Sequence, residues 1–174
     1  MTTVRKVAGL VGGLALAVLA PGRVTMGQTT AAVDTVLDFH VMAPVAGTFV
    51  GTANPVRGVP GGGLPWVIAH GDGTLRSDGS LTVNVKGLVL ATDPSVPTNQ
   101  QGTNPSPQFV GIVSCQAPDA MGGSKGTNVM TPPVQATPTG DARIQATVQL
   151  PTPCVAPIVF VADATGAWFA ASGR

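Results

Sequence analysis

The stretch that most constrains the fold is residues 64–90, LPWVIAHGDGTLRSDGSLTVNVKGLVL. Strand-forming side chains predominate at 66–70, 74–76 and 80–86, and two short turn sequences, Gly-Asp-Gly and Ser-Asp-Gly, separate these three segments. Asp-Gly is favoured in two-residue hairpin turns because both central residues adopt positive φ. The sequence therefore predicts a three-stranded antiparallel meander with turns at 71–73 and 77–79.

The last segment of the meander indicates how this sheet is buried. Leu81, Val83 and Val85 alternate with polar residues along 80–86. Successive side chains of a strand point to opposite faces of the sheet, so the apolar set faces a core and the polar set faces water. Such one-sided burial is typical of antiparallel sheets.

The composition excludes several classes of protein. The chain has 23 Gly, 16 Pro, no Glu and only three Lys among 174 residues. Glu and Lys favour exposed helix faces, so their scarcity argues for an all-β protein. Hydrophobic residues make up 44% of the chain, which is enough for a packed core. The formal net charge of +1 gives no electrostatic reason to expect nucleic acid or an anionic membrane as a partner.

Alternating or short apolar segments predict further strands at 33–43, 48–53, 108–115, 143–150, 154–162 and 167–171. Pro157 lies inside one of them, so that strand should form an edge or contain a bulge. Stretches rich in Pro, Gly and polar residues predict long loops near 92–107 and 116–140. We therefore expect one antiparallel β-sandwich or jelly-roll-like domain of about eight or nine short strands, covering 33–174.

The N-terminal residues predict export. Arg5 and Lys6 precede an apolar run at 7–20, which is the pattern of a secretory signal peptide. The run is shorter than the 18 or more residues typical of a membrane-spanning helix. We expect a signal peptide at 1–27, with the cut between about 27 and 32, and no membrane span after its removal. A retained anchor or a buried helix is the alternative.

Export makes the two cysteines interpretable. Cys115 and Cys154 are the only pair, and an oxidising compartment favours a bond between them. Cys115 shares the strand parity of Val113, and Cys154 that of Phe160, so both sulfurs are expected to point into the core. The predicted distance between the two Cα atoms is about 5–6 Å. Two free buried thiols are the alternative.

Two short His/Asp motifs form the sharpest candidate site. Asp38 and His40 are two apart, as are His70 and Asp72, so each pair shares one face of a strand. Side by side, the four side chains could bind a metal or perform acid–base chemistry. Ordinary solvent-facing and turn roles explain the same residues, and we expect no metal, no cofactor and no catalytic residue.

Two other patterns suggest function but have simpler explanations. Residues 122–126, GGSKG, match the letters of a nucleophile elbow, which requires a strand before it and a helix after it. A flexible loop is the interpretation preferred here. Trp66 and Trp168 could be stacking platforms for a sugar, but core packing is the expected role of both rings in a chain with so few aromatics.

These observations predict a secreted, non-catalytic β-sandwich protein, a structural or binding module outside the cell or in the cell envelope. One alternative is a self-assembling surface or matrix subunit that adds a strand, supplied by its N-terminal segment, to a neighbour. The other is a metal-dependent enzyme that uses His40 and His70. The expected partners are another copy of the chain, a carbohydrate or another cell-surface ligand, and not nucleic acid.

Overall fold

The computed structural model of the protein describes residues 2–3 and 32–173. The predicted signal peptide and its cut lie outside the described residues, apart from Thr2 and Thr3. The rest of the chain forms one compact unit from Ala32 onwards.

This unit is all-β and contains twelve strands and one short 3-10 helix, η1 (Gly47–Phe49). The strands are β1 (Thr35–Phe39), β2 (Met42–Pro44), β3 (Trp66–Val67), β4 (His70–Arg76), β5 (Ser80–Lys86), β6 (Val89–Leu90), β7 (Gln108–Pro118), β8 (Ser124–Met130), β9 (Val134–Gln135), β10 (Ala142–Thr147), β11 (Val155–Ala162) and β12 (Trp168–Ser172). Eight of them have five or more residues. The predicted all-β class is confirmed.

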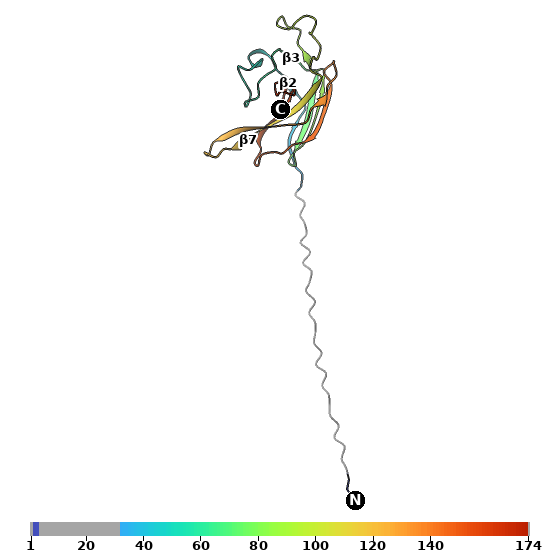
Figure 1. Ribbon diagram of the computed structural model, residues 1–174, viewed down its shortest axis with the longest axis vertical. Coiled ribbons are helices and arrows are strands. Elements are labelled where there is room, and N and C mark those ends of the chain that lie inside the picture. The colour runs from blue at the N-terminus through green and yellow to red at the C-terminus, as the bar shows by residue number, and fades with distance from the viewer. Residues whose placement is uncertain (1, 4–31, 174) are drawn as a thin grey trace. The chain divides into compact units, whose positions relative to one another are not determined.

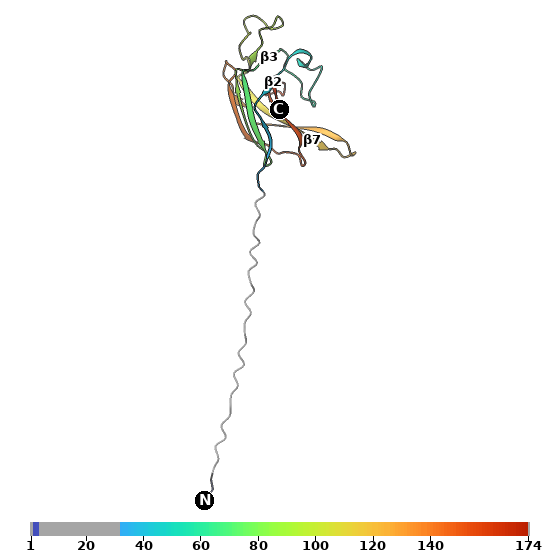
Figure 2. The same ribbon diagram turned by 180° about the vertical axis from the view of Figure 1, so that it is seen from behind.

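The strands form two main antiparallel sheets that pack face to face as a sandwich (Figures 1 and 2). One sheet has four strands in the order β1-β4-β5-β10. The other has six, in the order β2-β12-β11-β7-β8, with β9 also paired to β7. A Cβ atom placed on Gly111 of β7 would lie 3.0 Å from Leu81 and 3.5 Å from Ile144 of the four-stranded sheet. The two sheets therefore approach closely at the centre of β7.

The two central strands of the six-stranded sheet, β7 and β11, are buried on both faces over part of their length. Residues 109–115 of β7 and 159–162 of β11 are buried without alternation. One face meets the four-stranded sheet, and residues 46–63, the covering loop, lie over the other. In this loop, the Phe49 ring lies 6.4 Å from that of Trp168, which lies 5.7 Å from that of Phe160. The predicted strand at 48–53 is therefore wrong, because this segment is η1 followed by bends that pack on a sheet.

The predicted meander needs two corrections, and the first is that residues 71–73 form no turn. They continue β4, which pairs with β5 and turns only after Arg76. Both glycines serve packing: a Cβ on Gly71 would lie 2.7 Å from Met42, and one on Gly73 would lie 2.5 Å from Phe39. The segment at 66–70 is also divided, because Trp66 and Val67 pair with β6 and leave the four-stranded sheet.

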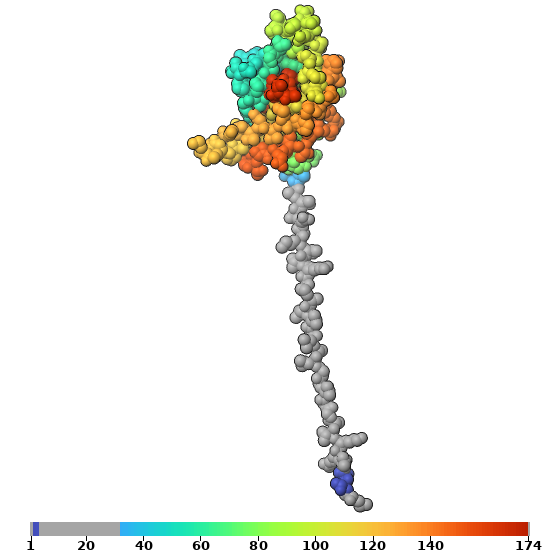
Figure 3. Space-filling view, in the orientation of Figure 1, coloured from blue at the N-terminus to red at the C-terminus, as the bar shows by residue number. Residues whose placement is uncertain are grey.

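The interpretation of 116–140 as a long loop is wrong as well. β7 extends to Pro118 and forms a regular hairpin with β8, and β9 follows. The far part of this hairpin, residues 116–126, projects from the sandwich as an arm (Figure 3). Met121 at its tip is 97% exposed. By contrast, residues 92–107 contain neither strand nor helix.

Candidate functional site

The four candidate His and Asp residues lie on the solvent side of the four-stranded sheet. The Nε2 atom of His70 lies 2.9 Å from Oδ1 of Asp72, and the Nε2 atom of His40 lies 3.6 Å from Oδ2 of Asp38. The hydroxyl of Thr74 donates to Asp38 at 3.1 Å. Each carboxylate is thus satisfied by close neighbours on its own face. In the part of the chain that the structure describes, no three His, Cys or Asp side chains gather as metal ligands.

Asp72 is the most constrained of these groups. The Nδ2 amide of Asn84 donates to its Oδ2 at 2.8 Å, and Asn84 lies directly opposite it on β5. This hydrogen bond is the largest cause of a lowered Asp72 pKa; partial burial opposes it, and the His70 hydrogen bond adds to it. A carboxylate held in its charged form in this way is a poor general acid or base near neutral pH.

A hollow of about 680 Å³ lies beside the turn between β4 and β5 and the segment that leads to β11. Asp78 is the one charged side chain in its lining. Its carboxylate accepts the Ser80 backbone N–H at 2.9 Å, a bond that lowers the Asp78 pKa. Asp78 therefore stabilises the turn, and the hollow offers no pair of nucleophile and base.

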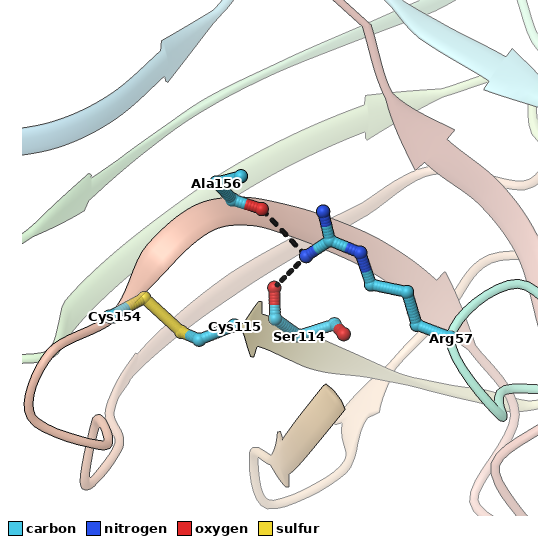
Figure 4. The surroundings of a disulfide bond; sticks show 5 residues. All are labelled: Arg57, Ser114, Cys115, Cys154 and Ala156. Atoms are coloured by element: carbon cyan, nitrogen blue, oxygen red, sulfur yellow. Dashed lines mark hydrogen bonds between the residues drawn. A yellow bond between two sulfur atoms is a disulfide. The ribbon is translucent and has the colours of Figure 1, made fainter. Parts of the chain in front are cut away.

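Cys115 and Cys154 form a disulfide, with their Cα atoms 4.9 Å apart (Figure 4). Cys115 is fully buried, as its strand parity predicts. The parity argument for Cys154 is wrong, because β11 changes register between Val155 and Ile158. Phe160 pairs with Ile112 and points to the covering loop, on the face opposite to Gly111 and Cys115. The bulge carries Pro157, so its predicted effect on the strand is confirmed.

Arg57 holds this bulge in place and was missed at the sequence level. Its Nη1 atom donates to the Ala156 carbonyl at 2.6 Å and to the Ser114 carbonyl at 3.1 Å, bridging β11 and β7 (Figure 4). Ala156 and Arg57 both have positive φ, 45° and 51°. Arg57 and Gly58 are the centre of a tight turn closed by two hydrogen bonds between Val56 and Val59. The sequence feature that could have indicated this role is a single Arg directly before Gly in an apolar loop.

The remaining sequence candidates have structural roles. Trp66 and Trp168 are each 4% exposed, and Trp66 stacks on Phe169 with ring centres 4.0 Å apart. Neither ring is available as a sugar platform. Ser124 starts β8 on the exposed hairpin and is followed by strand, so the requirement of a nucleophile elbow for a helix is unmet.

The outer edge of β8 has no partner strand among the described residues. The Thr131 N–H donates to the Gly111 carbonyl at one end of the β7–β8 ladder, and the Asp119 N–H donates to the Gly123 carbonyl at the other end. The register between these two ends has no shifts. Residues of an antiparallel pair alternate between bonded and non-bonded positions. Backbone N–H and C=O groups of four residues therefore point away from β7: Ser124, Gly126, Asn128 and Met130.

The other sheet edges are better protected. β1 carries a register shift and the charged Asp38, and β2 has three residues and ends on Pro44. β10 carries Arg143 and lies against β7 and β9. Charges, bulges, prolines and short length are the usual means of preventing strand addition. Within the described residues, β8 is a seven-residue edge with a single charge, Lys125.

A groove of about 250 Å³ adjoins this edge on the covering-loop side. Val59 and Pro60 of the covering loop, Ile112 of β7 and Met130 of β8 contribute apolar lining. Met130 is 44% exposed although it neighbours the core. An unpaired edge beside an apolar groove can give a bound strand both backbone hydrogen bonds and a place for alternate side chains.

Among the described residues, no helix has the length and apolar character needed to cross a membrane. The chain matches no protein-family model, no curated protein and no solved structure.

Proposed function

We propose that this protein is an exported, non-catalytic binding module that takes an extended partner strand at the outer edge of β8. The observation that carries the proposal is the row of outward backbone groups at Ser124, Gly126, Asn128 and Met130, beside the apolar groove. The start of this edge lies on the arm that projects from the sandwich (Figures 1 and 3). Strand addition derives affinity from the main chain and specificity from pockets for alternate side chains.

Export is supported by the basic and apolar N-terminal sequence together with the disulfide. We expect the mature chain to start between residues 28 and 33. Expression of the full-length gene with its own N-terminus, followed by intact-mass measurement of the released protein, tests this. Released protein that still begins at Met1 would contradict the assignment.

The binding mode is tested with a displayed library of extended heptapeptides, panned on the mature protein. Selected peptides are then titrated by fluorescence anisotropy against the wild type and against Ser124→Pro, which removes one outward N–H at the start of the edge strand. Gln145→Pro, at the outer edge of β10, is the matched control. We expect at least a tenfold loss of affinity for Ser124→Pro and no change for Gln145→Pro. Peptides that bind all three proteins equally would overturn the proposal.

The two alternatives receive unequal support. The self-assembly alternative has the N-terminal segment adding as a strand to a neighbour, but this segment already supplies β1 and β2 of its own sandwich. Self-assembly therefore needs another edge, and β8 is the available one. A metal-dependent enzyme built on His40 and His70 has no supporting observation, since each imidazole lies beside its own carboxylate on an exposed face.

A further inference from the structure

We infer that the strand received by β8 is β8 of a second copy, paired antiparallel about a two-fold axis at Thr127. This inference rests on the proposed binding edge and names its partner. A two-fold contact uses the same patch on both chains, so the edge must be complementary to itself. A two-fold contact between two β8 strands must therefore use a register that pairs the outward backbone groups of both chains.

In an antiparallel ladder, outward-facing residues must lie opposite outward-facing residues. With the axis at Thr127, Ser124 faces Met130 of the second copy and Gly126 faces Asn128, so all four outward residues of each chain are paired. Thr127 then faces its own equivalent, and Thr–Thr is a favourable cross-strand pair. Lys125 faces Val129, so no like charges meet.

The neighbouring registers are each worse for a physical reason. An axis at Lys125 places two ammonium groups opposite each other, which is destabilising. An axis at Asn128 places Ser124 opposite Pro132, which has no N–H to donate. An axis at Gly126 places Met130 opposite Gly122, in the hairpin turn, and so loses one strand pair at each end.

The side chains also fit the axis at Thr127. Gly126 has no side chain, so it leaves room for Asn128 of the second copy on the covering-loop side of the sheet. Met130 lies beside the groove on this same side, and its counterpart is the small Ser124. The arm, which carries the start of β8, projects from the sandwich in both views (Figures 1 and 2).

Cysteine cross-linking tests the register directly. Residues 124 and 130 of one chain are six positions apart, about 20 Å along a strand, so they cannot bond to each other within a chain. Across the proposed axis, opposed Cα atoms are about 5.5 Å apart, which is within disulfide range. The double variant Ser124→Cys/Met130→Cys should therefore oxidise to a covalent dimer on a non-reducing gel. The single variants are matched controls and should form no covalent dimer on the same gel.

The pair Ser124→Cys/Asn128→Cys reports the competing register with the axis at Gly126. A dimer from this pair and none from Ser124→Cys/Met130→Cys would overturn the axis at Thr127. Sedimentation velocity of the wild type should show a dimer whose dissociation constant rises at least tenfold in Ser124→Pro and in Gly126→Pro, and is unchanged in Gln145→Pro. Near-ultraviolet circular dichroism identifies any variant that fails to fold. If one proline variant fails to fold, the dissociation constant of the other proline variant tests the inference.

A wild type that stays monomeric at 100 µM or above, with no excess cross-linking of the double variant over the single ones, would overturn the inference. Library peptides that still bind and lose affinity in Ser124→Pro would then show that the binding edge is real but takes another partner. Failure of both experiments would remove the proposed function as well.

Discussion

The four-stranded sheet exposes one face to water, whereas the centre of the six-stranded sheet, at β7 and β11, is covered on both faces. In the first sheet, β5 alternates between apolar and polar residues, and the polar face of the sheet carries hydrogen-bonded groups such as Asp72 of β4 and Asn84 of β5. In the second, β7 and β11 are buried without alternation because the covering loop lies where water would otherwise be. Side chains on the two sheets should therefore differ greatly in what their removal costs.

The largest contrast is expected between Phe160 and Thr82. Phe160 is fully buried between the six-stranded sheet and the covering loop, so Phe160→Ala should lower the free energy of unfolding by about 3–5 kcal/mol. Thr82 lies on the open face of β5, and Thr82→Ala should change it by less than about 0.5 kcal/mol. Chemical denaturation of both variants measures the difference. Equal losses would show that the covering loop contributes no real burial.

The disulfide is expected to have the next largest effect. It ties β7 to the start of β11, both in the six-stranded sheet. Replacing both Cys115 and Cys154 by Ala should lower the free energy of unfolding by about 2–4 kcal/mol, because the unfolded chain gains conformational freedom. Denaturation under identical buffer conditions measures this. A double variant that unfolds with an unchanged midpoint would contradict the argument.

Substitution of Arg57 tests whether the guanidinium of this residue attaches the covering loop to the six-stranded sheet. Arg57→Ala removes both hydrogen bonds across the β7–β11 bulge and should cost about 1–2 kcal/mol, since the site is only partly buried. Arg57→Lys should restore only part of this, because an ammonium lacks the planar fork of donors. Arg76→Ala, exposed on the four-stranded sheet, is the control and should be nearly neutral. A larger loss from Arg76→Ala than from Arg57→Ala would reverse the comparison.

On the open face, the expected effects are electrostatic and small. The folded-state pKa of Asp72 lies below its unfolded value of about 3.9, so its contribution to stability is present above that pH and is lost as the pH falls through the folded pKa. Asn84→Ala should raise the pKa of Asp72, since the Asn84 amide is the main cause of the shift. A carbon-detected NMR titration of the Asp72 carboxyl measures it, with Thr82→Ala as a control. An unchanged titration would exclude the amide as the cause.

The smallest effects are expected at the two histidines. His40→Ala and His70→Ala should each change the free energy of unfolding by less than about 0.5 kcal/mol, because both side chains are largely exposed. Elemental analysis of the purified protein complements the denaturation curves. Stoichiometric metal in the wild type that is missing from either variant would show that these residues form a real site.

The two sheets also differ in how well the sequence predicts them. The alternating sequences of β5, β10 and β1 predicted half-buried strands, and all three lie in the sheet with one open face. The Ser-Asp-Gly turn before β5 is also where the sequence predicted it. The turn predicted at Gly-Asp-Gly is wrong, because Gly71 and Gly73 instead leave room for the side chains of Met42 and Phe39, which come from distant parts of the chain. Local turn propensity cannot reveal such a tertiary requirement.

In the six-stranded sheet, the limits of prediction have similar causes. The disulfide could be predicted from composition and the expected export. Pro157 indicated a bulge, but not the register shift and the positive φ of Ala156 on which the direction of Cys154 depends. β8, with the sequence SKGTNVM, has little apolar alternation because it pairs with β7 beyond the core. The candidate binding edge was therefore hidden in a segment whose composition is typical of loops.

The position of the disulfide at the base of the arm has a mechanical consequence. Any tension applied to β8 by a bound partner is transmitted down β7, where it acts as a shear on the ladder between β7 and β11. A covalent link joins Cys115 of β7 to the residue just before β11, so these two strands cannot slide past each other at that point. The disulfide therefore anchors the arm to the sandwich. Force applied to β8 should separate the bound partner before it unfolds the sandwich.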